Sequence, residues 1–304
     1  MKNEEDKINK YLFDKSTKYL LEVLNKANID EKEKNYRKEK LLRIYEEMLE
    51  ENYINNEYYS LAHEIKSFEL FSKCTSVNLA KDYKHEAGCD IRIYNNYQIE
   101  CVTSSPGDEN KNGYNAFYGS GIFNYNKKEN ILLTRILQSL NEKKVFYYNH
   151  LNKTIKENDP YIIFVSIGSL SYGSLWGELG VYFNNVLLGL DHEVIHFDRE
   201  QQKFTERSYE YRDYLVNHNN APVNCKFFRE ENSFVSAVIF SNAALDSEYS
   251  KENTFVFINP FAKNKVQVNK LPGLVYWKAD KYNKYYIPRY KGKNINEKIK
   301  HKYF

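Results

Sequence analysis

The chain has 304 residues, with 44 Lys or Arg against 41 Asp or Glu, a formal net charge of +3. It holds 28 Tyr and 18 Phe but only 12 Gly and 6 Pro, which excludes disordered and fibrous chains. No apolar run approaches the roughly 18 residues of a membrane span, and the first ten residues lack the apolar core of a secretory signal. We therefore expect a cytoplasmic protein with reduced cysteines and no membrane partner.

The first 55 residues predict an N-terminal helical segment rich in Lys and Glu. Apolar residues recur at helical spacing within residues 12–24 and again within 41–49. A third helix is expected over residues 57–73. It opens an α/β domain that we place at residues 56–290, and a basic tail at 291–304 completes the chain.

The apolar pattern then changes to the two-residue period of β-strands. Residues 89–94 and 97–103 predict a hairpin, and residues 104–130, which contain four Gly, predict a loop. Residues 131–151 return to helical spacing. Short apolar runs at 161–168, 234–242 and 254–260 predict buried strands. Helices that alternate with strands predict an α/β architecture.

Three carboxylates stand out by their context. Glu64 lies on the third predicted helix, and Asp90 opens the first strand of the hairpin. Glu100 lies in the second strand between Ile99 and Cys101, although strand interiors disfavour carboxylates. Mg²⁺ takes hard oxygen ligands and often uses one or two carboxylates with water and phosphate. Two carboxylates brought together by a hairpin therefore predict a site for Mg²⁺ or Mn²⁺.

The register of the hairpin tests this prediction. A two-residue loop would pair Asp90 with Cys101, so that Asp90 and Glu100 would face opposite sides of the sheet. A three-residue loop over residues 94–96 would pair Asp90 with Glu100 and place the two carboxylates side by side. Asn96 would then take the left-handed conformation that such loops need. We expect the three-residue loop, or a bulge with the same effect.

The order of these residues resembles the PD-(D/E)xK nuclease superfamily, in which a helix Glu precedes an Asp on one strand and a Glu-x-Lys on the next. Residues 61–152 are similar to an uncharacterised bacterial branch of that superfamily. The matching motifs are Glu64-Ile65, Gly88-Cys89-Asp90, Ile99-Glu100-Cys101-Val102, and Arg135 followed by Lys143. The resemblance, over about residues 57–265, implies a restriction-endonuclease-like core with a central mixed β-sheet flanked by helices. It also implies Mg²⁺-dependent cleavage of nucleic acid, with DNA favoured over RNA, in restriction or antiviral defence, with a homodimer as one form of the protein.

One position departs from the superfamily, because Val102 stands where the signature Lys is expected. Some families of the superfamily carry this cation on the following helix, and Lys143 is the candidate here. Arg135 and Ser139 precede Lys143 at intervals of four residues, so all three follow one flank of a helix. Arg135 is suited to a bidentate contact with phosphate.

These observations give each candidate residue a role. Asp90 and Glu100 are expected to bind the metal, Glu64 and Lys143 to assist catalysis, and Arg135 and Ser139 to bind substrate. Because the strand lacks its Lys, the alternative is a catalytically inactive nuclease-fold module that binds nucleic acid or protein.

A third hypothesis comes from His192-Glu193-Val194-Ile195-His196, which matches the HExxH motif of zinc metalloproteases. That motif binds zinc only on a helix, where both His lie on one face. Here apolar and polar residues alternate, and a second run begins at Lys203, which predicts a hairpin. In a strand the two His would be about 13 Å apart, too far for a common metal ion.

Overall fold

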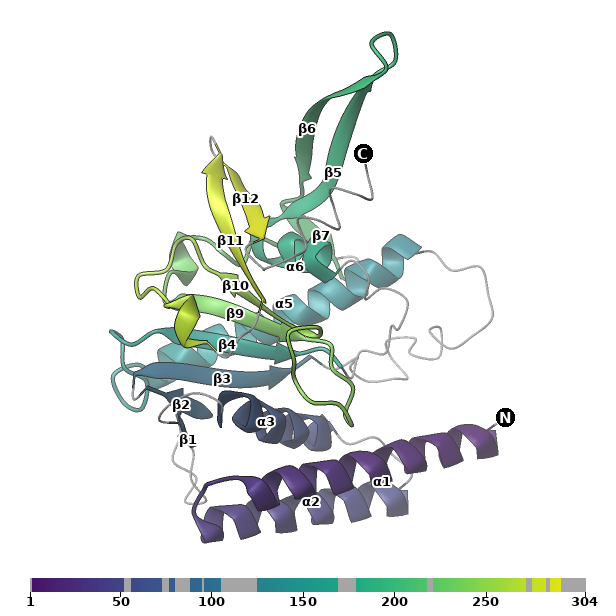
Figure 1. Cartoon of the computed structure of the whole chain (residues 1–304), viewed down its shortest axis with the longest axis vertical. Coiled ribbons are helices and arrows are strands. Elements are labelled where there is room, and N and C mark those ends of the chain that lie inside the picture. The colour runs from purple at the N-terminus through teal and green to yellow at the C-terminus, as the bar shows by residue number, and fades with distance from the viewer. Residues whose placement is uncertain are drawn as a thin grey trace.

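The computed structural model describes residues 2–51, 56–72, 77–79, 88–94, 96–104, 125–168, 179–217, 221–271, 275–282 and 285–290. A mixed β-sheet forms the centre of the molecule, and helices cover both of its faces (Figure 1). This arrangement confirms the predicted α/β class. The basic tail expected at residues 291–304 lies outside the described residues.

The central sheet has eight strands. In spatial order they are β1 (Val77–Leu79), β2 (Ile91–Ile93), β3 (Tyr97–Thr103), β4 (Tyr161–Ser166), β9 (Val235–Ser241), β10 (Thr254–Ile258), β11 (Val275–Tyr282) and β12 (Tyr285–Tyr290). The three middle strands β3, β4 and β9 run parallel, whereas β1, β2 and β3 form an antiparallel meander. All residues of β4 and β9 are buried, because parallel strands are covered on both faces.

The helices divide between the two faces of the sheet. Helix α3 (Asn56–Ser72) packs on β3 from one side, and α5 (Tyr125–His150) and α6 (Leu179–Leu188) lie on the other. Each face has its own core. The α3 face buries Ile99, Phe164 and Ile239, and the α5 face buries Ile163 and Val238. Residues that alternate along one strand therefore enter two different environments.

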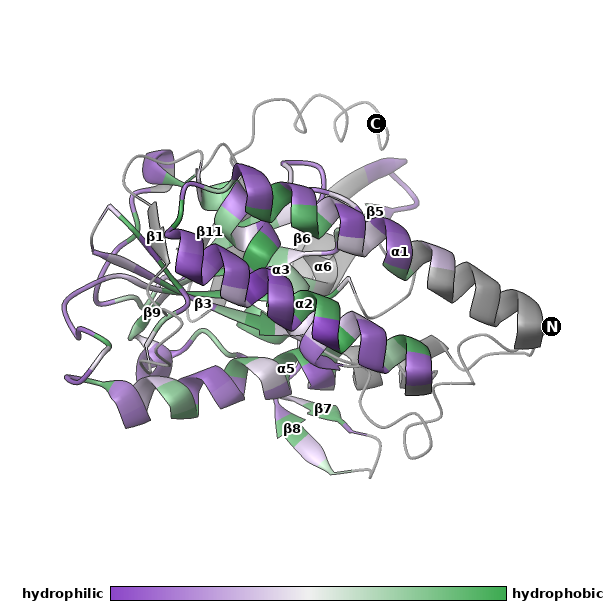
Figure 2. Cartoon of the chain, turned by 90° about the horizontal axis from the view of Figure 1, so that it is seen from below, coloured by the Kyte–Doolittle hydropathy of each residue, from purple (hydrophilic) through white to green (hydrophobic). Residues whose placement is uncertain are grey.

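The N-terminal helices form a layer beneath α3. Helices α1 (Lys2–Lys26) and α2 (Glu31–Glu51) run alongside each other, with purple hydrophilic residues on their outer sides in Figure 2. The side chain of Asp30 caps α2 by accepting a 2.9 Å hydrogen bond from the Lys32 amide. Leu24 and Ile44 share a core with Leu61 of α3, so the predicted boundary near residue 55 crosses one continuous hydrophobic cluster.

A second group of strands projects beyond the sheet (Figure 1). Strands β5 (Leu190–Asp198) and β6 (Lys203–Tyr211) pair as a long hairpin, and β7 (Tyr214–Val216) pairs with β8 (Pro222–Asn224). The hairpin predicted around residues 192–204 is thus confirmed. Two 3-10 turns, Glu230–Asn232 and Val268–Lys270, complete the regular elements.

One predicted boundary is wrong. Helix α5 begins at Tyr125, six residues before the expected start at residue 131. The glycines of the predicted loop stop at residue 121, and residues 125–130 contain neither Gly nor Pro, so nothing breaks the helix there. In the described part of the chain, every helix is too short or too polar to cross a membrane.

Candidate active site

The hairpin of β2 and β3 has the predicted register. Ile93 pairs with Tyr97 and Ile91 with Ile99, so the loop has three residues. Tyr94 of this loop has a left-handed φ of 52°, whereas Asn96 does not have a positive φ, so the prediction of Asn96 for this role is wrong. The Tyr94 ring packs edge to face on Tyr97, with centroids 5.9 Å apart, and this packing favours the strained position.

Asp90 lies immediately before β2 and leaves the regular ladder. Its amide donates a 3.0 Å hydrogen bond to the Ile99 carbonyl, although continuation of the register would pair Asp90 with Glu100. Its carboxylate Oδ2 accepts a 2.7 Å hydrogen bond from the Cys101 amide. The Asp90 carboxylate, 3% exposed, is therefore held on the backbone next to Glu100.

Glu100 is fully buried and faces α5. It pairs in register with Ile163, whose side chain belongs to the core beneath that helix. Lys143 of α5 reaches down to it, with 2.6 Å between Lys143 Nζ and Glu100 Oε1. The Lys143 side chain is 19% exposed, so this ion pair is shielded from most solvent. The structure thus brings Lys143 into contact with Glu100. This contact agrees with the expectation that the cation lies on the helix that follows the hairpin.

The two other candidates on α5 have contacts within their own helix. Ser139 is buried, and its hydroxyl donates a 3.1 Å hydrogen bond to the Arg135 carbonyl. Arg135 is half-buried, and its Nη1 lies 3.4 Å from Gln138 Oε1. Burial lowers the pKa of the Arg135 guanidinium from its usual value. The structure places Arg135, Ser139 and Lys143 along one helix but gives Ser139 a structural hydrogen bond.

Glu64 lies on α3, on the other side of the sheet from the Lys143 contact. Its Oε2 accepts a 3.0 Å hydrogen bond from Arg37 of α2, which also pairs with Glu33 at 2.5 Å. Burial raises the pKa of the Cys101 thiol well above its usual value, and the charges of Asp90, Glu64 and Glu100 raise it further. Glu64 is part of an interhelical ion pair with Arg37.

A polar network that the sequence did not indicate lies below the same strands. His63 Nε2 donates to the Phe164 carbonyl at 2.8 Å, and Tyr249 Oη lies 2.6 Å from His63 Nδ1. Lys66 Nζ donates to the Ala244 carbonyl at 2.7 Å and lies 4.4 Å from the centre of the Tyr249 ring. Burial lowers the pKa of His63 to about 4 and that of Lys66 to about 7. His63 and Tyr249 are 186 positions apart, so no local spacing could reveal this contact.

The residues around Asp90 and Glu100 suit a small divalent ion. The donors are two carboxylates on neighbouring strands, which supply hard oxygen ligands. Tyr161 adds a buried hydroxyl that has no hydrogen-bond partner among the described residues. Within the part of the chain that the structure describes, no group of three or more His, Cys, Asp or Glu could hold a metal. Asp90 and Glu100 would therefore be the two protein ligands of a divalent ion bound here, since Mg²⁺ commonly uses one or two carboxylates with water and phosphate.

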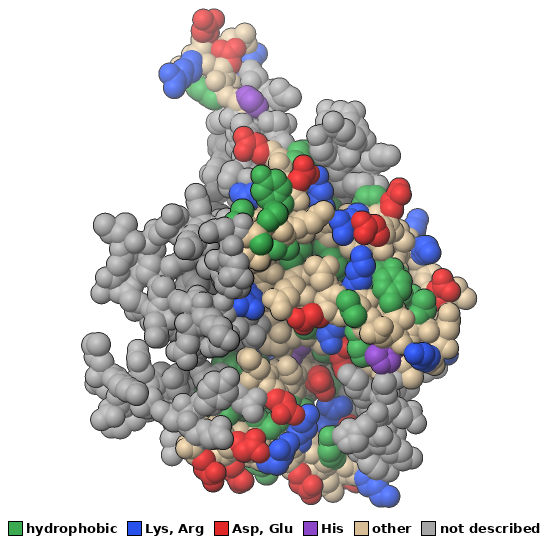
Figure 3. All heavy atoms as spheres, turned by 180° about the vertical axis from the view of Figure 1, so that it is seen from behind, with side chains coloured by type: hydrophobic (Ala, Val, Ile, Leu, Met, Phe, Trp, Pro, Cys, Tyr) green, Lys and Arg blue, Asp and Glu red, His purple; other side chains and the backbone are tan. Residues whose placement is uncertain are grey.

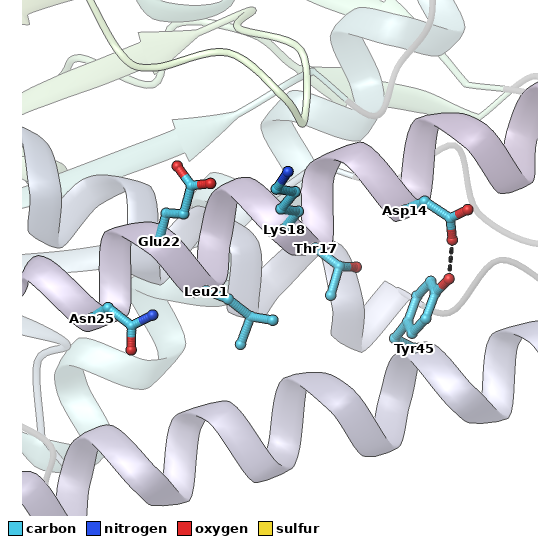
Figure 4. Close-up of a pocket in the computed structure, with 7 residues that line it drawn as sticks. All are labelled: Asp14, Thr17, Lys18, Leu21, Glu22, Asn25 and Tyr45. Atoms are coloured by element: carbon cyan, nitrogen blue, oxygen red, sulfur yellow. Dashed lines mark hydrogen bonds between the residues drawn. The ribbon is translucent and has the colours of Figure 1, made fainter.

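Two other features lie apart from this site. The HExxH segment belongs to strand β5, so the helix that a zinc protease needs is not present there. A hollow of about 420 Å³ lies between α1 and α2. Figure 4 shows the residues that line it, with Asp14 and Tyr45 hydrogen-bonded. Its lining comes from the N-terminal helices alone.

The described surface carries both signs of charge. In Figure 3, Lys and Arg side chains are interspersed with Asp and Glu over the described part of the face seen from behind. Compared with models of protein families, with curated proteins and with solved structures, the chain gives no match.

Proposed function

We propose that this chain is a metal-dependent nuclease that hydrolyses phosphodiester bonds, with DNA as the first substrate to test and RNA as the second. The observation that carries the proposal is the 2.6 Å contact between Lys143 Nζ and Glu100 Oε1. It supplies from the helix the cation that Val102 cannot supply from the strand. A restriction-endonuclease-like core is part of the proposal, and the meander β1–β3 with a parallel β4 beside it supports that core.

Asp90 and Glu100 would hold the divalent ion. A bound Mg²⁺ lowers the pKa of a water ligand and offsets charge on the phosphodiester. Lys143 would orient the attacking water and balance negative charge in the transition state. Arg135, two helical turns before Lys143, would contact a phosphate. Because the formal charge is only +3, the positive charge that binds nucleic acid must be concentrated near the site.

The test compares wild-type protein with an Asp90→Asn/Glu100→Gln double variant. Plasmid DNA and a single-stranded RNA are incubated with each protein in Mg²⁺, in Mn²⁺ and in EDTA. We expect metal-dependent cleavage by the wild type and a loss of at least about 1000-fold in the double variant, because both metal ligands are removed. Equal cleavage by both proteins, or none by the wild type with either substrate, would refute the proposal.

Val102 supports a second candidate, a catalytically inactive module of the same fold that binds nucleic acid. Its side chain packs against the α5-face core instead of contributing a charge. A Val102→Lys/Lys143→Met variant separates the two candidates, because it moves the cation back to the strand. Restored cleavage in this variant, compared with Lys143→Met alone, would favour the nuclease. Binding of DNA without cleavage in every variant would favour the inactive module. A role in restriction or antiviral defence rests on the resemblance alone.

A further inference from the structure

Tyr161 is a buried group next to the carboxylate pair that the proposed chemistry does not use. It is the first residue of β4 and pairs in register with Gln98 of β3. Glu100 lies two residues further along β3 and on the same face, so the two Cα atoms are about 8 Å apart. A Tyr side chain spans such a diagonal. The ring therefore lies within reach of the space beside Glu100.

The Tyr161 side chain is held in one position. It is completely buried, and its ring packs on Tyr147 of α5, with centroids 5.0 Å apart, and on Phe234, at 6.1 Å. Among the residues that the structure describes, none makes a hydrogen bond with its hydroxyl oxygen. A buried hydroxyl in this condition needs an explanation, and an ordered water or a ligand is the usual one.

The Tyr161 phenol stays neutral in this environment. Burial raises the pKa of the Tyr161 phenol well above its usual range, and the negative charges of Glu100 and then Asp90 raise it further. A neutral phenol is a hydrogen-bond donor at every physiological pH. A donor near two buried carboxylates, without a direct contact to either, is suited to a water molecule between them.

We propose that Tyr161 is a positioning residue whose hydroxyl donates a hydrogen bond to a water held beside Asp90 and Glu100 when the divalent ion is bound. This inference rests on the proposed function, because it assumes an ion at the carboxylate pair. Groups that hold the ligands of a metal from outside the coordination shell commonly change metal affinity by about 10- to 100-fold. Tyr161 would act in that way through the bound water.

The experiment uses Tyr161→Phe, which removes only the hydroxyl, with Tyr147→Phe as the matched control from the same aromatic cluster. Free Mn²⁺ is measured by electron paramagnetic resonance during titration of each metal-free protein, and thermal unfolding is measured without metal. We expect Tyr161→Phe to bind Mn²⁺ about tenfold more weakly than the wild type. Its metal-free melting temperature should be equal or higher, because the hydroxyl has no partner to lose. Tyr147→Phe should keep the wild-type Mn²⁺ affinity.

The possible failures can be told apart. Wild-type Mn²⁺ affinity in Tyr161→Phe would overturn this inference and leave the proposed function standing. An equal loss in Tyr147→Phe would also overturn it, since the effect would then come from the aromatic packing. If the wild type does not bind Mn²⁺, and Glu100→Gln behaves in the same way, both this inference and the proposed function are overturned.

Discussion

The buried polar groups on the two faces of strand β3 have different kinds of partner. On the α5 face, Glu100 is completely buried and meets the charged Lys143 at 2.6 Å. On the α3 face, His63 and Lys66 are buried among neutral partners, and burial lowers the pKa of both bases. One face therefore keeps opposite charges together, and the other favours the neutral forms of its bases.

This difference indicates which buried polar groups stabilise the fold and which are candidates for catalysis. The neutral network is satisfied, since His63 donates to the Phe164 carbonyl and lies within hydrogen-bond distance of Tyr249. Such a network fixes one arrangement of α3, β4 and the segment around Tyr249. A buried ion pair is a poor way to gain stability, because desolvation offsets much of the attraction. A role of the charged pair on the α5 face in catalysis is part of the nuclease proposal.

The largest effect on stability is expected from breaking the charged pair. Lys143→Met leaves Glu100 buried without this cation and should lower the free energy of unfolding by about 3–5 kcal/mol. The double variant Glu100→Gln/Lys143→Met should recover most of the loss, because no charge is then buried. Urea denaturation measures both. Lys144→Met is the matched control. Its partner Glu231 is 60% exposed and 3.5 Å away, so it should cost no more than about 1 kcal/mol. An equal loss in both lysine variants would contradict this account.

A smaller effect is expected from pH on the neutral face. The pKa of His63 is about 4 in the folded protein, against 6.5 for the unperturbed side chain. Between these values the unfolded chain binds more protons, so the contribution of His63 is complete above pH 6.5. It is lost as the pH falls towards 4, and the total is about 3 kcal/mol. Lys66, whose charge also lowers this pKa, has a pKa of about 7, so its titration falls at the upper edge of that window and mostly above it.

Urea denaturation at pH 7 and pH 4 measures this contribution. The wild type should lose about 3 kcal/mol more than His63→Gln over that interval. Tyr249→Phe removes the hydroxyl next to Nδ1, so it should raise the pKa of His63 and reduce the pH dependence. Identical pH dependence in wild type and His63→Gln would show that His63 is not buried in its neutral form.

The sequence was informative where a short-range rule decides the geometry. The parity of side chains in a hairpin requires a three-residue loop if Asp90 and Glu100 are to share a face, and the loop has three residues. Lys143 was indicated by the resemblance to the nuclease superfamily, in which some families carry the cation on the following helix, and Lys143 does contact Glu100. The loop prediction thus depends on neighbours within one hairpin, whereas the Lys143 prediction depends on the resemblance.

The rest depended on tertiary contacts that no local pattern contains. The partner of Glu64 is Arg37, which lies on α2, in the N-terminal helical segment outside the predicted α/β domain. The hydroxyl of Tyr161 is notable only because everything around it is packed, and in the sequence it opens an ordinary apolar strand. The left-handed loop residue was misassigned because Asn is the usual choice, whereas packing on Tyr97 selected Tyr94.

The smallest effect on stability tests whether Glu64 belongs to the structure or to the site. Glu64→Gln keeps an oxygen for Arg37, and the Glu64 side chain is 28% exposed, so the loss should be under about 1 kcal/mol. If Glu64 assists through the metal or its water, cleavage should fall about tenfold in the same variant.

The control for Glu64 is Glu33→Gln, because Glu33 pairs with the same arginine but lies on α2. Its side chain is 6% exposed, and it should lose more stability, about 1–3 kcal/mol, with unchanged cleavage. Stability and cleavage are measured on both variants under the same conditions. If Glu64 acts on the site across the sheet, Glu64→Gln should show the larger loss of cleavage and Glu33→Gln the larger loss of stability. If cleavage falls only as far as each variant unfolds, Glu64 is a structural ion-pair partner, and the site consists of Asp90, Glu100 and Lys143.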